Sequence, residues 1–466
     1  MSRMRAQPVD ATPLWTVIGT RPTTPLLGHC GQVVVDSVAS LHGNCRSPCF
    51  DRFEIEIKSM KWISSFAIVA VVSLIWPGVG PHSAAPGSLP RRAGEQSPGK
   101  VRFLLRIEPS TDPFVASGNP ADEQWIREHW WRMMVYSTWF DNKTRWYTAG
   151  LLYKDCCGIY LKQQNVLNGH PDWIMRDEAG NGLFIQYDCN PEQNVCSHYA
   201  ADVGNPGFRR WWINEAKTVI RRGYKGLWID DVNMSWRISN GQGRFVNPID
   251  PRTGRLMPEN DWRRNLADFM EQVRVELPGI DIVHNAIWFA GPKGIRDLDP
   301  FIQREYRAAD YINNEHGVYG DQGMRGGAGE WSYQTRLDYY DRVHALGKGV
   351  IIDEVAAESN TLEGRKFTLA TYFLVSTGRD AVGNQRIHRS SEWWSGYDID
   401  LGDPLGPRQM RDGLYRRDYS GGVVLVNPPE SPQRTVSFPS PLLTLEGAPV
   451  TSLTLGAKQG AILRRP

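Results

Sequence analysis

Two adjacent aspartates directly follow a short apolar run near the middle of this chain, and this pattern narrows the choice of fold. Residues 223–233 read GYKGLWIDDVN, so that the run LWI lies between a glycine turn and Asp230 and Asp231. A run of this kind is typical of a buried parallel strand. Because ligands bind at the carboxyl ends of such strands, we expect both aspartates at the functional end of the sheet. The alternative is that one of them caps a helix or ties down a loop.

Strand-like and helix-like stretches alternate on both sides of this run, which favours a parallel α/β fold. The predicted strands are residues 102–107, 132–139, 151–153, 227–229, 280–287, 309–314, 349–352 and 380–383. Eight strands with helices between them predict a (β/α)8 TIM barrel over residues 101–400. A doubly wound open sheet is the alternative. It requires a glycine-rich phosphate turn after its first strand, where this chain reads IEP.

The motif around the fourth strand resembles a known group of enzymes. The segment NPGFRRWWINEAKTVIRRGYKGLWIDDVN is a helix opened by Asn-Pro and followed by a strand that ends in Asp-Asp. It resembles the glycosyl-hydrolase-like TIM barrels related to endo-α-1,4-polygalactosaminidase, and more distantly the α-galactosidase and α-amylase type barrels. The resemblance extends from about residue 101 to the C-terminus. It implies a glycoside hydrolase that acts on a polysaccharide or oligosaccharide without a cofactor.

Glycosidic cleavage uses one carboxylic acid to protonate the leaving oxygen and a second carboxylate as nucleophile or base. The α-galactosidase type carries its nucleophile after strand four and its acid/base after strand six. The resemblance therefore implies Asp230 as nucleophile or base and Glu315 as acid. Asp231 is the alternative to Asp230, because strand alternation directs only one of the two into the barrel. Asp353 and Glu354, after strand seven, are alternatives for the acid or ligands for sugar hydroxyls.

Polar and aromatic residues at other strand ends are candidates for substrate binding. We expect hydrogen bonding or stacking from residues after strands two, three and five, namely Tyr136, Trp139, Asp155, His284, Asn285 and Trp288. Trp228, Trp393 and Trp394 are further aromatic candidates. Packing in the core is the competing interpretation for each aromatic side chain and for His284.

Four cysteines follow residue 100. An even number in an exported chain favours disulfides, and Cys189 with Cys196 is the pair expected across a short loop. Zinc is less favoured, because Cys156 and Cys157 are adjacent and no histidine stands at ligand spacing. We therefore expect no metal.

The first hundred residues are not expected to belong to the folded body. Residues 1–59 show no sustained period and are interpreted as disordered or as a mis-annotated extension. Residues 60–85 have the pattern of a signal peptide, with the apolar run 62–79 and a small-residue site before Pro86. Residues 86–100 are a linker. We expect a secreted or cell-envelope protein, with membrane attachment only if the apolar run is retained as an anchor.

After the barrel, residues 410–466 alternate short strands with turns, which predicts a small antiparallel β-sandwich. It is expected to shield the barrel rather than to bind carbohydrate. The formal net charge of +2 gives no bias toward nucleic acid, and we expect a monomer. Two functions compete with hydrolysis. One is a carbohydrate-binding barrel without catalysis, and the other is a metal-dependent polysaccharide deacetylase, which needs a histidine pair beside an aspartate.

Overall fold

The computed structural model describes residues 96–107, 115, 117–136, 141–233, 237–286, 298–321, 324–384 and 387–466. The predictions for residues 1–59 and 60–85, for most of the linker, and for Trp139 and Trp288 lie outside them. The chain divides into two units, Met1–Pro86 and Gly87–Pro466, and the described residues all belong to the second. Within them, no helix has the length and apolar character that a membrane span requires.

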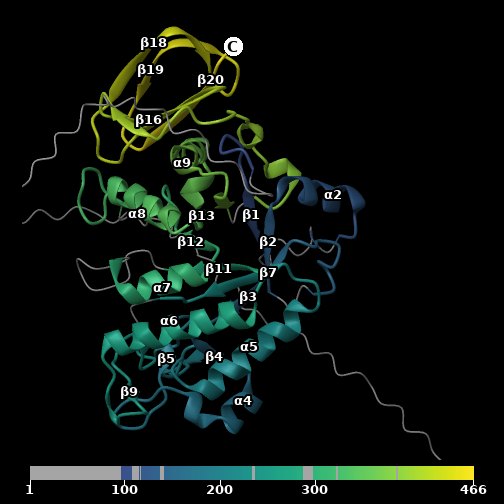
Figure 1. Ribbon diagram of the computed structural model, residues 1–466, viewed down its shortest axis with the longest axis vertical. Coiled ribbons are helices and arrows are strands. Elements are labelled where there is room, and N and C mark those ends of the chain that lie inside the picture. Colours follow the sequence, from purple (N-terminus) through teal and green to yellow (C-terminus); the bar gives the residue numbers. More distant parts are fainter. Residues whose placement is uncertain are drawn as a thin grey trace, which may run out of the picture. The chain divides into compact units, whose positions relative to one another are not determined.

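Eight parallel strands close into a barrel, as the sequence predicts (Figure 1). Around the barrel the order is β1-β14-β13-β12-β11-β7-β3-β2. The strands are β1 (Phe103–Arg106), β2 (Arg132–Val135), β3 (Gly150–Asp155), β7 (Gly226–Asp230), β11 (Asp281–Asn285), β12 (Tyr311–Glu315), β13 (Gly349–Glu354) and β14 (Ala381–Asn384). Each stretch predicted as a strand overlaps one of these, so the (β/α)8 prediction is confirmed.

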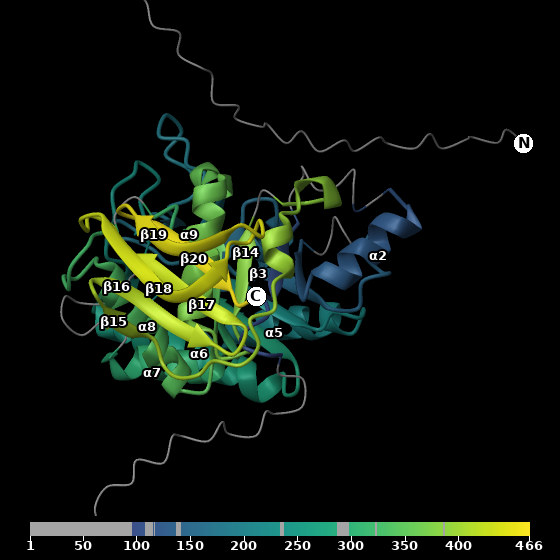
Figure 2. The same ribbon diagram turned by 90° about the horizontal axis from the view of Figure 1, so that it is seen from above.

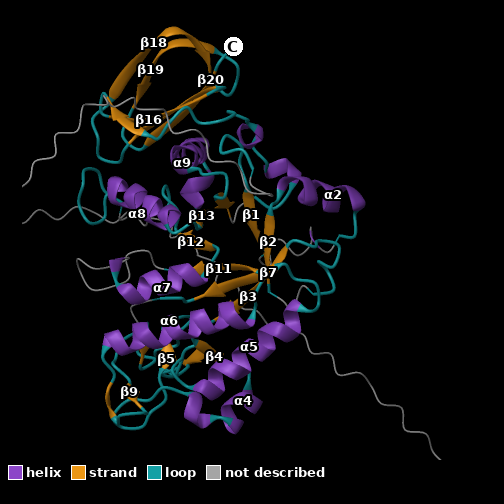
Figure 3. Ribbon diagram, in the orientation of Figure 1, coloured by secondary structure: helices purple, strands orange, loops and turns teal. Residues whose placement is uncertain are grey.

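Helices between the strands surround the barrel (Figure 3). They are α2 (Pro120–His129), α5 (Pro206–Ile220), α6 (Glu259–Glu276), α7 (Pro300–Ala308), α8 (Tyr333–Ala345) and α9 (Leu362–Val375). Three begin with the same local sequence, an Asn or Asp cap followed by proline. At α5, for example, the Asn205 side chain accepts hydrogen bonds from the amides of Gly207 and Phe208. Proline loses nothing at this position, because its missing N–H would have no partner within the helix.

The barrel interior is filled by one buried apolar side chain from each strand. These are Leu104, Met134, Leu151, Trp228, Val283, Tyr311, Ile351 and Ala381. Trp228 is fully buried in this layer. The barrel is thus a packed core with no open channel at this level, so a substrate must bind above it at the carboxyl ends of the strands.

The connection between β3 and α5 is a long insertion with a small sheet of its own, as its length in the sequence indicates. It contains β4 (Gly158–Tyr160), α4 (Gln164–Gly169), the 3-10 helix η2 (Pro171–Trp173), β5 (Phe184–Ile185) and β6 (His198–Ala200). The strand β8 (Ile238–Ser239), which follows β7, completes the order β4-β6-β5-β8. The disulfide predicted between Cys189 and Cys196 is present in this insertion. A two-stranded hairpin, β9 (Ile249–Asp250) with β10 (Arg255–Leu256), precedes α6.

The C-terminal antiparallel domain is also present, and its strands are joined in one six-stranded sheet. The strands are β15 (Gln409–Arg411), β16 (Leu414–Tyr419), β17 (Gly422–Asn427), β18 (Arg434–Leu443), β19 (Pro449–Leu455) and β20 (Gln459–Arg464). The sheet curls around a small apolar core of its own (Figure 2). Its strands β16, β17 and β20 pack on α9 of the barrel. Short 3-10 helices η4 (Ala357–Asn360), η5 (Ser390–Glu392) and η6 (Ser395–Asp398) lie in the preceding loops.

Candidate active site

The carboxyl ends of adjacent barrel strands bring the predicted acidic residues to one mouth. In the strand register, Asp155 of β3 lies beside Asp230 of β7, and Glu315 of β12 lies beside Asp353 of β13. The strand β11, which ends in Asn285, separates the two pairs. Residues distant in sequence therefore meet because parallel strands place all their carboxyl ends at the same edge.

Asn285 connects Asp230 to Glu315. Its Nδ2 atom donates hydrogen bonds to Asp230 Oδ1 and to Glu315 Oε2, each 2.8 Å long. Its Oδ1 atom accepts a hydrogen bond of 2.9 Å from Asn313 Nδ2, which fixes the orientation of the amide. The predicted nucleophile and the predicted acid thus lie on either side of one nitrogen atom.

Asp230 receives two further hydrogen bonds. The hydroxyl of Tyr153 donates to Asp230 Oδ2 over 2.6 Å, and the backbone amide of Asp231 donates to Oδ1 over 2.9 Å. These three donors fix the orientation of the Asp230 carboxyl group. Tyr153 is held in turn by stacking on Trp228, with ring centroids 5.6 Å apart.

Arg106, at the end of β1, pairs with two carboxylates across the mouth. Its Nη1 atom lies 3.2 Å from Glu315 Oε1 and 3.0 Å from Asp353 Oδ2, while its guanidinium lies over the ring of Trp228. Burial acts to raise the pKa of Glu315, but the charge of Arg106 and the Asn285 hydrogen bond outweigh it, so the pKa lies below its ordinary value. The Glu315 side chain is 37% exposed and that of Asp353 is 0% exposed, so only Glu315 opens to solvent.

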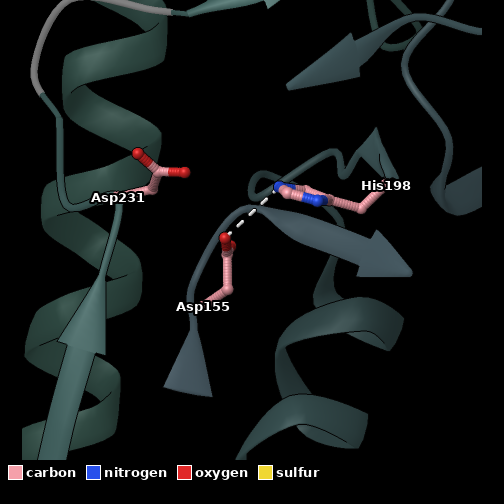
Figure 4. A group of neighbouring side chains, drawn as sticks. All are labelled: Asp155, His198 and Asp231. Atoms are coloured by element: carbon pink, nitrogen blue, oxygen red, sulfur yellow. Dashed lines mark ion pairs between the residues drawn. The ribbon is translucent and has the colours of Figure 1, made fainter. Parts of the chain in front are cut away.

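A second group of polar side chains, drawn in Figure 4, includes Asp231, which follows Asp230, and Asp155, which is paired with Asp230 in the strand register. Asp155, His198 and Asp231 place ligand atoms within 4.8 Å of one another. Asp231 reaches this group because its backbone turns into the left-handed region, with φ of 54°, directly after β7. Arg237 Nη1 lies 3.1 Å from Asp231 Oδ1. Asp230 and Asp231 therefore both lie at the barrel mouth, whereas the alternation of side chains along a strand predicts that only one of them does.

Charge crowding shifts the protonation of this group. Burial and the nearby charge of Asp230 raise the pKa of Asp155 to about 7, and burial together with Asp155 raises that of Asp231 well above its ordinary value. Burial also lowers the pKa of His198 to about 4, so its imidazole is neutral at pH 7. Two carboxyl groups and one neutral imidazole can share protons or bind hydroxyl groups. Among the described residues, this trio also has ligand atoms suited to a divalent metal ion.

His198 approaches Asp155 closely because the residue between them has no side chain. A Cβ atom at Gly158 would lie 2.4 Å from His198 Cδ2 and 3.1 Å from Asp155 Oδ1. The backbone amides of Cys157 and Gly158 both donate to Asp155 Oδ1, over 2.7 and 2.6 Å. His198 Nε2 lies 3.5 Å from Asp155 Oδ2.

Three of the predicted substrate ligands have other roles in the structure. Glu354 is 1% exposed and accepts hydrogen bonds from the amides of residues 318–320 and from two hydroxyl groups, so it anchors the loop after β12 instead of facing a sugar. Trp228 belongs to the barrel core. His284 is fully buried and pairs with Glu305 of α7, away from the mouth.

Trp393 and Trp394 are partly buried and pack on aromatic rings. Trp393 contacts the rings of Phe103 and Trp130, and Trp394 contacts Tyr397. Tyr136 is half-buried and lies against Tyr153, with ring centroids 4.6 Å apart. Of these three side chains, Tyr136 contacts Tyr153, whose hydroxyl donates a hydrogen bond to Asp230.

Arg106, Tyr153 and His198 were not predicted from the sequence. Arg106 had a usable signal, since it is charged and lies two residues after Leu104, on the same face of the first strand. Tyr153 stands two residues before Asp155 in the same way. His198 lies inside the insertion, and nothing in the local pattern relates it to Asp155.

A groove of about 550 Å³ lies between the insertion and the β9–β10 hairpin. Its walls include Arg176, Asp177 and Arg255, and none of the carboxylates described above. A smaller cavity of about 130 Å³ is bordered by Tyr153, Asp155 and residues of β4 and α5. The carboxylates that meet through Asn285 lie at the barrel mouth, so the mouth and not the larger groove is the candidate active site.

Comparison with known proteins agrees with this chemistry. The family described as hypothetical glycosyl hydrolase family 15 (GHL15) matches residues 144–423, which is more than half of the chain. A comparison with curated proteins finds no match.

Solved structures with related folds include three glycoside hydrolases. The glycoside hydrolase domain of PelA from Pseudomonas aeruginosa is 13% identical, with 61% of this chain and 94% of that chain covered and a TM-score of 0.35. The α-amylase from Geobacillus thermoleovorans is 11% identical, with coverages of 79% and 99% and a TM-score of 0.43. The α-galactosidase from Thermus thermophilus is 12% identical, with coverages of 71% and 66% and a TM-score of 0.41. Because these TM-scores are low, the assignment of a (β/α)8 barrel rests on the strand order and register of this chain and not on these structures.

Proposed function

Because the chain belongs to hypothetical glycosyl hydrolase family 15 and is a glycosidase with a carbohydrate substrate, we propose that Asp230 and Glu315 cleave the O-glycosidic bond with retention of configuration. The shared hydrogen bond from Asn285 is the observation that supports this pair. Two contacts of 2.8 Å to one nitrogen allow a separation of at most about 5.6 Å between Asp230 Oδ1 and Glu315 Oε2, twice the single distance. Retaining enzymes hold their carboxyl groups about 5 to 5.5 Å apart, and inverting enzymes about 6.5 to 9.5 Å.

Asp230 is the nucleophile in this proposal. Oδ1 accepts from Asn285 and from the backbone, whereas Oδ2 accepts only from Tyr153 among the contacts identified, so Oδ2 has a lone pair for the anomeric carbon. Attack forms a glycosyl ester on Asp230 and breaks the bond to the leaving oxygen. Water then hydrolyses the ester and restores the carboxylate.

Glu315 is the acid and then the base. It protonates the leaving oxygen in the first step and takes a proton from the attacking water in the second. Its exposure distinguishes it from Asp353, whose side chain is closed to solvent and holds Arg106. The lowered pKa of Glu315 means that the substrate-free enzyme carries the reactive proton only at acidic pH, so the optimum is expected there.

The remaining polar groups at the mouth bind the sugar in this proposal. Asp155, Asp231 and His198 form a cluster beside Asp230 with unused acceptor capacity, which suits the hydroxyl groups of the ring that reacts. Asn285 holds both reacting carboxylates, and Tyr136 offers an aromatic edge beside Tyr153. Asp353 acts through Arg106 and through Asn313, which orients Asn285.

A carbohydrate-binding barrel without catalysis is the competing function. A barrel of that kind is expected to direct either Asp230 or Glu315 away from the pocket while aromatic side chains still line it. The contact of both carboxylates with one amide favours hydrolysis, and so does the packing of Trp228, Trp393 and Trp394 against other rings.

Reducing-end release from a panel of bacterial and plant polysaccharides tests the proposal. We expect at least one glycan to be cut by the parent chain, and the rate to fall about a thousandfold or more in Asp230→Asn and in Glu315→Gln. Glu128→Gln, an exposed side chain on α2, is the matched control and should retain full activity. Binding of glycans without cleavage would support the carbohydrate-binding function, and active Asp230→Asn would exclude this residue as nucleophile.

The stereochemistry gives an independent test. Proton NMR of the first product should show the anomer of the substrate, and azide should restore activity to Asp230→Gly with formation of the opposite anomer of the glycosyl azide. Azide rescue of Glu315→Ala should instead give the substrate's anomer. A first product of opposite configuration in the parent enzyme would contradict the retaining mechanism.

Export is a further part of the proposal. The disulfide between Cys189 and Cys196 suits an oxidising compartment, and residues 60–85 have the pattern of a signal peptide. N-terminal sequencing of the protein recovered outside the cytoplasm should begin at Pro86. Recovery of the uncleaved chain in the membrane fraction would instead indicate an anchor.

A further inference from the structure

Two adjacent cysteines lie beneath the proposed active site with their sulfur atoms in close contact. Cys156 and Cys157 follow β3 directly, and their Sγ atoms are 2.7 Å apart. Hydrogen bonds to sulfur are long, because the atom is large and a weak donor. Both cysteines are free in the structure, and 2.7 Å is longer than the ~2.05 Å of an S–S bond, but it is shorter than van der Waals contact between two unbonded sulfur atoms, so a small movement brings them to bonding distance.

Among the residues that the structure describes, no other free cysteine is available to either sulfur. The residue exposures of Cys156 and Cys157 are 0% and 1%, and Cys189 is bonded to Cys196. Burial raises the pKa of both thiols, that of Cys157 to about 11, so neither is suited to act as a nucleophile in the folded state. Within this part of the chain, each of the two sulfurs is therefore the other's available covalent partner.

We propose that Cys156 and Cys157 form a vicinal disulfide. The two thiols lose two protons and two electrons as the S–S bond forms. The electrons reduce the disulfide of oxidised glutathione or of a thiol–disulfide oxidoreductase to two thiols. Exchange takes place during folding, before the turn after β3 is buried.

The surrounding hydrogen bonds tolerate the loss of both S–H donors. The sulfur atoms lie 3.3 and 3.5 Å from the carbonyl oxygen of Asp231, where each thiol is a weak donor. That carbonyl also accepts a hydrogen bond of 2.6 Å from the amide of Asn233. Oxidation therefore leaves no buried acceptor without a partner.

The crosslink would stiffen the turn that holds Asp155. The amides of Cys157 and Gly158 donate to Asp155 Oδ1, and the amide of Cys156 donates to the carbonyl oxygen of Asp230 over 3.1 Å. The crosslinked turn is thus joined by the Cys156 amide to the end of β7, so it connects the two strand ends that carry the acidic cluster. Its effect on Asp155 is positional, because neither sulfur reaches the carboxyl group through an identified contact.

Counting thiols by alkylation tests the crosslink. The full chain is refolded in a glutathione redox buffer, unfolded without reductant, treated with iodoacetamide and mapped by peptide mass spectrometry. We expect no adduct on Cys156 or Cys157, and a peptide lighter by the mass of two hydrogen atoms than its thiol form. Adducts on both residues, in a sample in which Cys189–Cys196 is oxidised, would overturn the proposal.

A variant and a reduction experiment complete the test. Cys157→Ser should expose one alkylatable thiol at Cys156, which shows that the position is detectable. Reductant added to the folded chain should reduce Cys189–Cys196 before the vicinal pair, because Cys189 is only partly buried. Alkylation of Cys156 in the parent chain to the same extent as in Cys157→Ser would contradict the crosslink.

Discussion

Asn285 Nδ2 lies 2.8 Å from both Asp230 Oδ1 and Glu315 Oε2. An amide at this position neutralises neither carboxylate and yet holds both, so their spacing is set by one side chain on the strand between them. The amide itself is oriented by Asn313, whose Nδ2 also lies 3.2 Å from Asp353 Oδ2. Four neighbouring strands are thereby joined through side chains at the mouth of the barrel.

Asn285→Ala should slow catalysis without unfolding the protein. The substitution removes two hydrogen bonds to charged groups, each contributing about 1.5 to 3 kcal/mol, but water at the mouth can replace part of them. We expect kcat/KM to fall about ten- to a hundredfold on a glycan that the parent cuts. Asn214→Ala, on the exposed face of α5, is the matched control. An unchanged kcat/KM in Asn285→Ala would mean that the spacing of the two carboxylates does not depend on this amide.

Arg106→Gln should move the pH profile of the enzyme. Arg106 holds the pKa of Glu315 below its ordinary value, so its removal raises that pKa. If Glu315 must be protonated in the free enzyme, kcat/KM falls as pH rises through this pKa, and the alkaline limb of the variant lies at higher pH than that of the parent. Arg221→Gln, an exposed arginine after α5, should leave the profile unchanged.

The direction of this shift also tests the assigned roles. If the acidic limb of the kcat/KM profile moved in place of the alkaline limb, Glu315 would work in its ionised form, as the nucleophile. Because Arg106 also compensates the buried Asp353, the double variant Arg106→Gln/Asp353→Asn should be measured beside it. This second variant removes the buried Asp353 charge together with its partner and separates the effect on Glu315 from a loss of folding.

The eight barrel strands were predictable because each carries its own local signal, an apolar run followed by polar residues or glycine. Periodicity and strand ends also place Asp230 and Glu315 at the mouth. The contact between Arg106 and Glu315 had no such signal, because it joins β1 to β12 across the closed barrel. Closure of the sheet, and not the local sequence, determines which polar residues meet.

The same limit applies to other residues that were predicted for the site. Glu354 ends β13 just as Glu315 ends β12, but the loop after β12 folds over Glu354, and the backbone amides of this loop donate hydrogen bonds to its carboxylate. Trp228 and Asp230 lie on the same face of β7, two residues apart, so one fills the core while the other reaches the mouth. Local periodicity shows which residues of a strand face the barrel interior. It does not show whether such a residue lies in the core or at the mouth.

Glu354→Gln should destabilise the protein more than it slows the reaction. Glu354 accepts three backbone amides and the hydroxyl groups of Ser359 and Thr368, so an amide side chain in its place brings an unwanted donor into a buried site. We expect the free energy of unfolding to fall by about 2 to 4 kcal/mol, measured by chemical denaturation.

Glu358→Gln, an exposed neighbour, should change the free energy of unfolding by less than about 0.5 kcal/mol. At temperatures at which Glu354→Gln remains folded, its kcat should stay within a fewfold of the parent value. A loss of kcat as large as that in Glu315→Gln, with the stability unchanged, would restore Glu354 as a candidate for the reaction.

Glu305→Gln should make the protein less sensitive to rising pH. Glu305 is fully buried and hydrogen-bonded to His284 Nδ1, and burial raises its pKa well above the ordinary value while lowering that of His284 to about 3. The pair is therefore neutral, with the Glu305 carboxylic acid donating to the imidazole. For Glu305 the pKa is higher in the folded than in the unfolded chain, so its contribution to stability is complete below about pH 4.5 and is lost as pH rises toward the folded value.

Glutamine keeps a donor for His284 and removes this proton linkage. We expect the free energy of unfolding of Glu305→Gln, relative to the parent, to increase by about 1 kcal/mol or more between pH 5 and pH 7, measured by urea denaturation. The lowered pKa of His284 acts in the opposite direction, because its contribution to stability is lost as pH falls below about 6.5. This contribution is present in the parent and in Glu305→Gln alike. Glu192→Gln, exposed in the insertion, should follow the parent at both pH values. If Glu305→Gln also follows the parent, Glu305 is ionised in the folded chain and the neutral pair is wrong.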